Sequence, residues 1–267
     1  MKGSLGAFRR EVWRHYKKEG RHDLPWRKTH DPYKILVSEV TLQQTQVLRV
    51  IPKYKAFLKR FPTVRALAKA PLSAVLKEWS GLGYNRRAKY LHEAAKTAVS
   101  DFRGDLKAAL AHPLPGVGPY TRAAVRTFAF NEPHTMIETN IRAAYIHHFF
   151  PGKKTVSDRD LLPLIERAAE GQDPREWHWA LMDYGSHLKH IHPNPTRRSA
   201  HYHVQTKFKG SLREIRGEII RLLATGPFGD LALSQRLRFD EQGMRQALTG
   251  LQKDGLIVSE KGSWRIA

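Results

Sequence analysis

A glycine-rich turn stands at residues 114–121, where the chain reads Leu-Pro-Gly-Val-Gly-Pro-Tyr-Thr and runs on into a helical pattern. Glycines let a backbone approach a phosphate closely, and the amides at the start of the next helix would then point at it. The chemistry that this turn could do is therefore the binding of an anion. An ordinary tight connection between two helices explains the same residues equally well.

Composition limits what else the chain can do. Its 267 residues include no cysteine, which excludes disulfides, thiolate nucleophiles, cysteine-ligated zinc and a conventional iron–sulfur cluster. Lysine and arginine number 46 against 25 acidic residues, for a net charge of +21. We expect a polyanionic partner, although charge alone leaves nucleic acid, an anionic membrane surface and simple solubility open.

No transmembrane or secretory segment is predicted. No stretch approaches the ~18 apolar residues that a spanning helix needs, and residues 1–13 lack the apolar core of a signal peptide. We therefore expect a soluble intracellular protein.

The elements that would position the turn are helical. Proline and glycine interrupt a run of short amphipathic patterns. The expected helices are 32–42, 45–60, 63–70, 72–78, 86–101 and 119–130, followed by a helical block at 140–188 and a loop at 190–203.

After Gly210 the pattern changes. Three helical segments, at 211–225, 231–237 and 240–254, are followed by two alternating segments, 256–260 and 263–266, around a Lys261-Gly262 turn. This order resembles a winged helix. Such modules contact either DNA or protein, and the sequence leaves that choice open.

Several motifs stand in a fixed order in the first half of the chain: Leu24–Arg27, Asp31–Tyr33, Ser38–Val47, Arg60–Val64, Gly81–Ala88 and the turn at 114–121. Together they resemble the helix-hairpin-helix (HhH-GPD) DNA glycosylase superfamily, and most of all its adenine-mismatch (MutY-like) branch. The resemblance implies a mainly α fold of two helical subdomains, followed by a small winged-helix-like α/β C-terminal domain.

The resemblance also implies domain boundaries. We expect a glycosylase domain at residues 1–208 and a winged-helix-like domain at 209–267. Within the first, a six-helix barrel subdomain would span about 32–135, and a second helical subdomain would combine 1–31 with 136–208.

The implied reaction is removal of a base. Breaking an N-glycosidic bond requires a protonated leaving base and a carboxylate beside the developing sugar cation. Glu39 stands where the family has its proton donor. Glu138 stands where the family has an aspartate, and its extra methylene would move the carboxylate by about 1.5 Å on an unchanged backbone. Either the backbone compensates or the activity is altered, and we expect compensation.

Tyr120 predicts the type of product. Bifunctional relatives have a lysine at this position, whose amine forms a Schiff base with the sugar. Tyrosine cannot do this, so we expect an abasic site in an intact strand, with Tyr120 lining the base pocket.

The target base must leave the duplex to be reached. Tyr84 matches the family's intercalating tyrosine, although the adjacent tyrosine is replaced here by Asn85. The residues expected to contact DNA are Gln43, Gln44, Thr45, Tyr84, Arg87, Leu114, Gly116, Val117, Gly118 and Asn140.

The family's four iron–sulfur cysteines have no counterpart. By spacing, their positions are occupied by Lys189, Thr196, Ser199 and about Gln205. Zinc bound by nearby histidines remains an alternative, but a packed basic loop is the simpler interpretation, and we expect neither a metal nor a cofactor. The histidines concerned are His187, His190, His192, His201 and His203.

Three functions remain in competition. The first, which the segment 42–47 favours and which we expect, is excision of adenine opposite guanine or 8-oxoguanine. The second is excision of thymine or uracil opposite guanine, and the third is a catalytically inactive DNA-binding or regulatory protein. In each case the expected partner is double-stranded DNA, with a mispaired or damaged base for the two enzymes. We further expect a monomer with no membrane association, in the cytoplasm with the nucleoid.

Overall fold

The computed structural model describes residues 4–204 and 207–267, and the chain forms two compact units. Unit 1 comprises residues 1–35 and 119–204, and unit 2 comprises residues 36–118 and 205–267. Most of the described residues are helical and the rest form connecting loops and one two-stranded sheet, so the predicted mainly α fold is confirmed.

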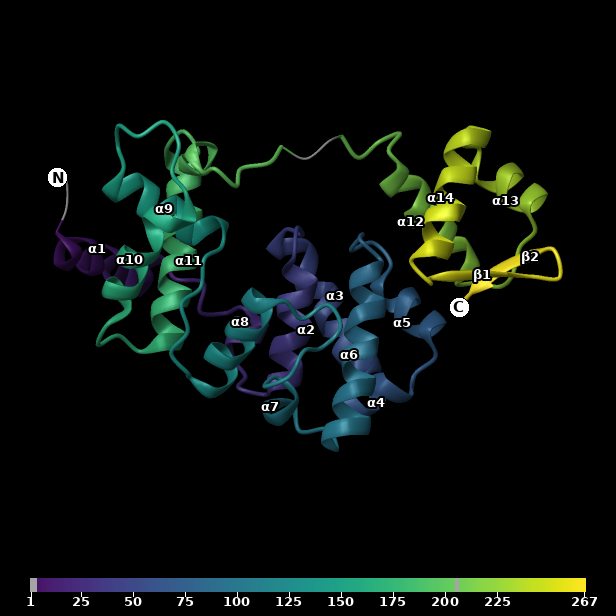
Figure 1. The fold of residues 1–267 in the computed structure, drawn as a ribbon, viewed down its shortest axis with the longest axis horizontal. Helices are drawn as coiled ribbons and strands as arrows, with labels where there is room; N and C mark the ends of the chain where they lie inside the picture. The colour runs from purple at the N-terminus through teal and green to yellow at the C-terminus, as the bar shows by residue number, and fades with distance from the viewer. Residues whose placement is uncertain (1–3, 205–206) are drawn as a thin grey trace. The chain divides into compact units, whose positions relative to one another are not determined.

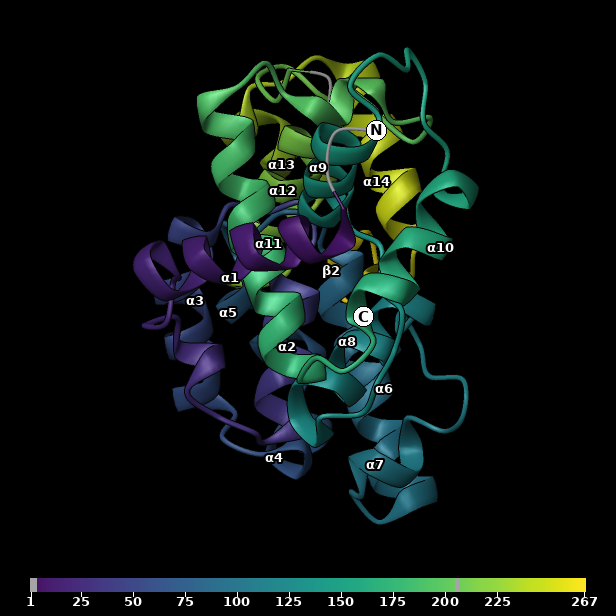
Figure 2. The ribbon, with the colours of Figure 1, turned by 90° about the vertical axis from the view of Figure 1, so that its left-hand side faces the viewer.

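Unit 1 is built around its longest helix, α11. Helices α1 and α9 both pack against α11, and Figure 2 shows α1 lying across it. The elements of unit 1 are α1 (Leu5–Glu19), η1 (Pro25–Arg27), α8 (Pro119–Phe130), α9 (Thr139–Phe149), α10 (Asp158–Ala169), α11 (Pro174–Ile191) and η2 (Pro195–Arg198).

Aromatic side chains form the centre of unit 1. The ring of Phe8 on α1 lies 4.8 Å from that of Tyr145 on α9 and 6.2 Å from that of Trp177 on α11, measured between centroids. All three residues are buried. Burying several aromatic side chains at one point is a large apolar contribution to stability, and it holds the three helices together.

The first part of unit 2 is a bundle of short helices. Helix α6 packs against α4, α5 and α7, and Figure 1 shows it running beside α4 and α5. The elements are α2 (Pro32–Leu42, which enters the unit at Leu36), α3 (Val47–Arg60), α4 (Val64–Lys69), α5 (Leu72–Trp79), α6 (Arg86–Phe102) and α7 (Leu106–Ala109).

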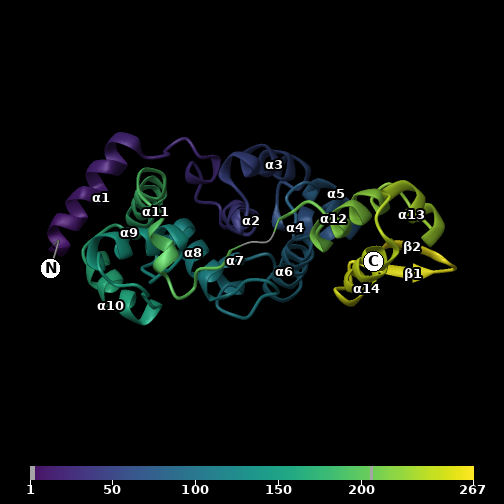
Figure 3. The same cartoon turned by 90° about the horizontal axis from the view of Figure 1, so that it is seen from above.

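The second part of unit 2 is the C-terminal module, visible with its strands in Figure 3. It consists of α12 (Leu212–Leu223), α13 (Asp230–Leu237), α14 (Glu241–Lys253), β1 (Ile257–Glu260) and β2 (Ser263–Ile266). The strands are antiparallel, with Ile257 opposite Ile266, and Phe228 pairs with Trp264 on the other side of β2. This is the helix, helix, helix, wing order that the sequence predicted.

The predicted helices agree with the observed ones to within one or two residues at most ends. Helix α1 was not predicted, and neither were α7 and the short η2 turn inside the predicted loop. None of the helices of the described residues is long and apolar enough to cross a bilayer. The three-part domain organisation remains a prediction.

Candidate active site and nucleic-acid interface

Glu138 occupies the N-terminus of α9 in unit 1. It is the N-cap residue, and its Oε1 atom accepts hydrogen bonds from the amides of Asn140 (2.7 Å) and Ile141 (2.8 Å). The side-chain amide of Asn140 donates to Oε2 at 3.1 Å. A glutamate is an unusual N-cap, because shorter side chains normally reach these amides. Here the longer side chain turns back on the helix, so both carboxylate oxygens are held in place.

Burial and the neighbouring polar and charged groups shift the pKa of Glu138 in opposite directions. Burial raises the pKa of its carboxyl, and this effect exceeds the lowering by the two amide hydrogen bonds and by the nearby charges of Lys189 and Arg142. Burial lowers the pKa of Lys189 in turn, while Glu138 raises it. Lys189 is therefore the cation of α11 that favours the ionised form of this carboxyl.

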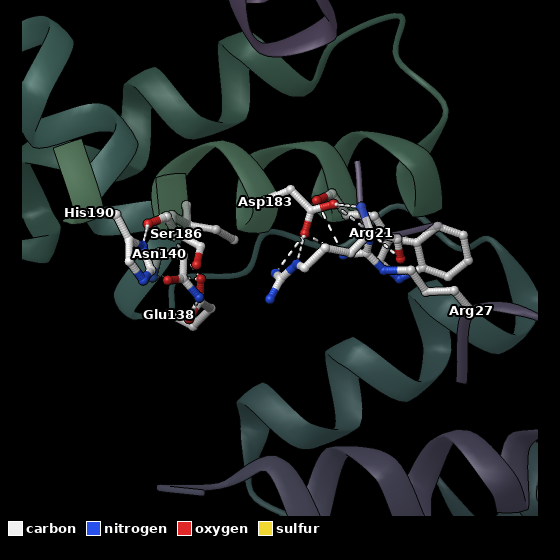
Figure 4. Close-up of polar contacts among 9 residues, drawn as sticks. Arg21, Arg27, Glu138, Asn140, Asp183, Ser186 and His190 are labelled. Carbon is white, nitrogen blue, oxygen red and sulfur yellow. Dashed lines mark hydrogen bonds and ion pairs between the residues drawn. The ribbon is translucent and has the colours of Figure 1, made fainter. Parts of the chain in front are cut away.

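Gly185 on α11 allows the N-terminus of α9 to come close. A Cβ atom on Gly185 would lie 1.9 Å from the carbonyl oxygen of Asn140, so only glycine fits this contact. Figure 4 shows Glu138 and Asn140 beside the turn of α11 that carries Ser186 and His190. Close backbone packing at Gly185 therefore helps to set the position of the Glu138 carboxylate.

The Leu24–Arg27 motif meets α11 at Asp183, two residues before Gly185 (Figure 4). The guanidinium of Arg27 bonds both Asp183 oxygens, at 2.7 and 2.9 Å, and Arg21 adds an ion pair at 2.6 Å. Burial alone would raise the pKa of Asp183, but these partners outweigh it and hold the pKa below its usual range. The two bonds from Arg27 hold the Leu24–Arg27 segment against α11.

Glu39 lies on α2 in unit 2, in a helix buried on nearly all sides. Val37, Ser38, Val40 and Thr41 around it are buried, and Glu39 itself is 8% exposed. Among the acidic side chains of the described residues, those of Asp183 (3%) and Glu39 (8%) are the least exposed, and Glu138 is half-buried. Asp183 is paired with Arg21 and Arg27, and Glu39 lies among apolar and hydroxyl-bearing residues of α2.

Arg87 locks the end of α2. Its guanidinium donates to the carbonyls of Val40 (2.9 Å) and Thr41 (3.1 Å), and also to that of Gln43. It also bonds the carbonyls of Leu82 and Gly83, both at 3.1 Å. A cation is favourable at a helix C-terminus. Burial lowers the pKa of Arg87 to about 10, which leaves it charged near neutral pH.

These contacts give Arg87 a positioning role, because they tie the residues after α2 to the Gly81–Gly83 turn. Thr45 belongs to the same network, since its hydroxyl accepts from Arg87 at 3.2 Å. A direct DNA contact by Arg87 or Thr45 stays a prediction.

Tyr84 stands at the end of that turn and is 38% exposed. Its backbone is left-handed (φ 49°), as are those of Gly81 and Gly83, so the turn is sharp. The Arg87 guanidinium lies 5.5 Å from the centre of the Tyr84 ring. Arginine and tyrosine stack favourably at this distance.

Five of the predicted DNA-contact residues line one cleft of unit 2, with a volume of about 700 Å³. They are Gln43, Gln44, Tyr84, Arg87 and Gly116. The structure thus brings together residues that are separated by 73 positions along the chain.

The glycine-rich turn is tight, with Leu114 and Val117 paired as a backbone bridge. Both side chains are buried, so contact with a ligand would come from their backbone. Gly116 has a φ of +67°, and a Cβ there would meet Tyr90 at 2.5 Å. No atom would lie within 4 Å of a Cβ on Gly118, where α8 begins directly afterwards at Pro119. Gly116 is therefore needed for the fold, while Gly118 leaves the backbone approachable from outside.

Tyr120 is the second residue of α8, in unit 1, and it is half-buried. Its role in lining a base pocket stays a prediction, as do the catalytic roles of Glu39 and Glu138.

An arginine organises the segment expected in place of the iron–sulfur loop. Arg198 donates to the carbonyl of Phe150 and, at 3.3 Å each, to those of Ile146 and Lys153, in the last turn of α9 and the residues just after it. Ser199 forms a backbone bridge with Val156. Gln205, the fourth position, lies outside the described residues.

The described residues contain no cluster of three or more histidine, aspartate or glutamate side chains that could hold a metal ion. The histidines contact other groups instead. The His187 ring lies tilted against that of His15, with centroids 4.5 Å apart. His192 stacks on His147 at 4.6 Å, and His190 bonds the carbonyl of Ser186 at 2.7 Å.

Sequence reasoning missed residues that act through distant contacts. Arg213, Arg216 and Lys253 of the C-terminal module also line the cleft beside Tyr84. No local pattern marks them, because their position depends on how the module packs against α5 and α6.

Residues 37–165 match the model of the HhH-GPD superfamily of base excision DNA repair proteins. The chain is 32% identical to an adenine DNA glycosylase of Mycolicibacterium smegmatis, across 89% of this chain and 88% of that protein. It is 34% identical to an adenine DNA glycosylase of Buchnera aphidicola, across 67% of this chain but only 52% of that protein. The chain belongs to the HhH-GPD superfamily of base excision DNA repair proteins.

Two solved structures share the fold. A thermostable thymine-DNA glycosylase matches with a TM-score of 0.60 and 30% identity, across 68% of this chain and 86% of that one. An endonuclease III in a non-covalent DNA complex matches with a TM-score of 0.55 and 15% identity, across 73% and 98%. The second likeness concerns the fold alone.

Proposed function

We propose that this protein is a monofunctional DNA glycosylase that removes adenine mispaired with guanine or 8-oxoguanine. The observation that carries the proposal is its two carboxylates, Glu39 buried in α2 and Glu138 fixed at the N-terminus of α9, in a chain of a base-excision superfamily. The identity with adenine DNA glycosylases supports adenine as the base.

In this proposal Glu39 protonates the departing base. Glu39 is buried, and its carboxyl would give a proton to the base as the N-glycosidic bond breaks. Glu138 supplies the negative charge that stabilises the cation developing on the sugar. The three hydrogen bonds to its oxygens fix the carboxylate before the reaction, so little reorganisation is needed in the transition state.

Tyr120 makes the reaction hydrolytic only. A phenol forms no Schiff base, and the product is a free base with an abasic site in an unbroken strand. The protein acts as a monomer on double-stranded DNA, to which its net charge of +21 attracts it.

Excision of thymine opposite guanine is the second candidate. It is favoured by the 30% identity with a thymine-DNA glycosylase whose structure matches across 68% of this chain.

The experiment is single-turnover incubation with duplexes that each carry one defined mispair, followed by hot alkali to cleave abasic sites. We expect cleavage of the adenine strand in A·G and A·8-oxoguanine duplexes, only after alkali. Cleavage of the thymine strand of T·G alone would replace the first candidate by the second. Cleavage of no duplex would contradict both.

The subtype is tested by borohydride trapping on abasic DNA. The wild-type protein should form no covalent adduct, with a Schiff-base lyase as the positive control. Trapping at the level of that lyase would contradict the monofunctional assignment.

A further inference from the structure

The C-terminal module reaches the Tyr84 turn through α12. The guanidinium of Arg213 donates to the Tyr84 hydroxyl at 2.9 Å and lies 5.8 Å from the centre of its ring. Arg87 lies 5.5 Å from the same ring. Two guanidinium groups, one from each part of unit 2, therefore lie close to this exposed aromatic side chain.

A seam around Asp254, at the end of α14, holds the module in this place. Asp254 pairs with Arg216 of its own module and with Arg86 of α6 (3.4 Å), and its carbonyl accepts from Lys89 at 2.9 Å. The next residue, Gly255, has a φ of +62°, and a Cβ there would lie 2.6 Å from the Lys89 ammonium. The close approach of the module to α6 thus depends on particular residues.

The cleft between these elements is strongly basic. Its lining includes five cationic side chains and one acidic side chain, Asp254, which is already paired. The cations are Arg86, Arg87, Arg213, Arg216 and Lys253. Such a cleft favours a polyanion.

The Tyr84 ring and the side-chain amides of Gln43 and Gln44 favour a nucleic acid over other polyanions. An exposed ring flanked by cations is the arrangement on which nucleic-acid bases stack while phosphates are neutralised. Gln43 and Gln44 line the same cleft, and their amides match the donor and acceptor groups of base edges. An acidic peptide would use the cations but neither of these features.

We propose that the C-terminal module is part of the DNA-binding surface, with Arg213 and Lys253 contacting the phosphodiester backbone beside a base stacked on Tyr84. This inference rests on the proposed function in taking DNA as the ligand. In this proposal the C-terminal module contributes to binding of the duplex, and Arg213 is a positioning residue for Tyr84.

The test compares Arg213→Met and Lys253→Met with Arg221→Met. Arg221 also lies on α12 but outside the cleft lining, and it pairs with Glu218 on the same helix. Each variant removes one positive charge. Lys253 is exposed, so its variant will fold even if Arg213→Met disturbs the contact between α12 and the Tyr84 turn, and melting temperatures check this.

Affinity for undamaged and mispaired duplexes is measured by fluorescence anisotropy across a range of salt concentrations. Arg213→Met should weaken binding on the order of tenfold, as expected for a charge-assisted hydrogen bond. Each cleft variant should lower the salt-dependence slope by about 0.9, the contribution of one neutralised phosphate. Arg221→Met should change affinity by less than about twofold.

Equal effects of all three variants would overturn the proposal. Its failure can be distinguished from failure of the proposed function. If the wild-type protein excises bases while the cleft variants bind DNA like Arg221→Met, only the DNA-binding role of the module is wrong. If it excises no base but the cleft variants still lose affinity, the surface stands and the excision assignment is wrong.

Discussion

The two units hold their candidate functional residues in different ways. In unit 1 the Glu138 carboxylate is fixed by backbone amides, by Asn140 and by a close helix contact at Gly185. In unit 2 the exposed Tyr84 ring lies among arginines at the edge of a basic cleft. The first arrangement suits a reacting group, which must not move, and the second suits contact with a large charged ligand. Substitutions at Glu138 and its supports should therefore change reaction rate, whereas substitutions in the cleft should change affinity.

The largest effect should come from removing the carboxylates. Glu39→Gln and Glu138→Gln should each lower the single-turnover rate by roughly 10²–10⁴-fold, because an amide neither gives the proton nor carries the charge. Duplex affinity should remain, and the double variant should lose less than the product of the two single losses. Wild-type rates for both variants would remove Glu39 and Glu138 from the mechanism.

A smaller effect, on both stability and rate, is expected where Gly185 of α11 contacts the start of α9. Gly185→Ala should destabilise the protein by about 1–3 kcal/mol, because the new methyl group overlaps the Asn140 carbonyl. It should also slow excision by displacing Glu138. Gly6→Ala is the control in the same unit, since the nearest atom to its Cβ would lie 3.6 Å away. Chemical denaturation measures the loss of stability, and single-turnover kinetics measure the loss of rate. Equal stability of Gly185→Ala and Gly6→Ala would contradict the claim that close packing at Gly185 matters.

A third effect concerns Lys189 and the pH dependence of the reaction. Its positive charge lowers the pKa of Glu138, which burial otherwise raises. The carboxylate must be ionised to act, so the rate should fall as pH drops through this raised pKa. Lys189→Met should move that acid limb to higher pH, whereas Lys154→Met, at an exposed site, should not. Superimposable pH–rate profiles of the wild type and Lys189→Met would show that Lys189 does not act on the catalytic group.

The smallest effect should be on stability at mildly acidic pH. Burial, together with the facing His187, lowers the pKa of His15, and burial with His148 and His192 lowers that of His147. Depressed histidine pKa values mean that the unfolded chain binds more protons, so stability falls as pH drops below about 6.5. The melting temperature should be lower at pH 5.5 than at pH 7.5. A smaller drop is expected in His15→Gln, and an unchanged drop in that variant would contradict this origin.

Much of the fold could be predicted because helical periodicity and proline or glycine breaks are local signals. The wing strands followed from alternation around Lys261-Gly262, and their observed bounds agree closely. Helix α1 was missed, because the first residues were considered only as a targeting segment. The pairing of Arg27 with Asp183 joins residues 156 positions apart, and no local sequence pattern predicts it.

The candidate site could be predicted as a set of residues but not as an arrangement. Family motifs indicated Glu39, Glu138 and Tyr84, and one cleft contains five of the expected DNA contacts. The sequence did not show that Glu138 caps its own helix, or that Asn140 donates to it. Nor did it reveal Arg213, whose contact with Tyr84 depends on packing of the C-terminal module. Such features arise from tertiary contacts that periodicity does not encode.

The most direct test of the account is the single-turnover rate of Glu138→Asp on the preferred mispair, measured with its melting temperature. Aspartate is a good N-cap, so the helix and the melting temperature should be retained. Its carboxylate would withdraw by about 1.5 Å from the position that the backbone of α9 supports. We predict a loss of rate on the order of a hundredfold, the cost of such a misplacement. A rate equal to or above that of the wild type would contradict the claim that this site is built around a glutamate.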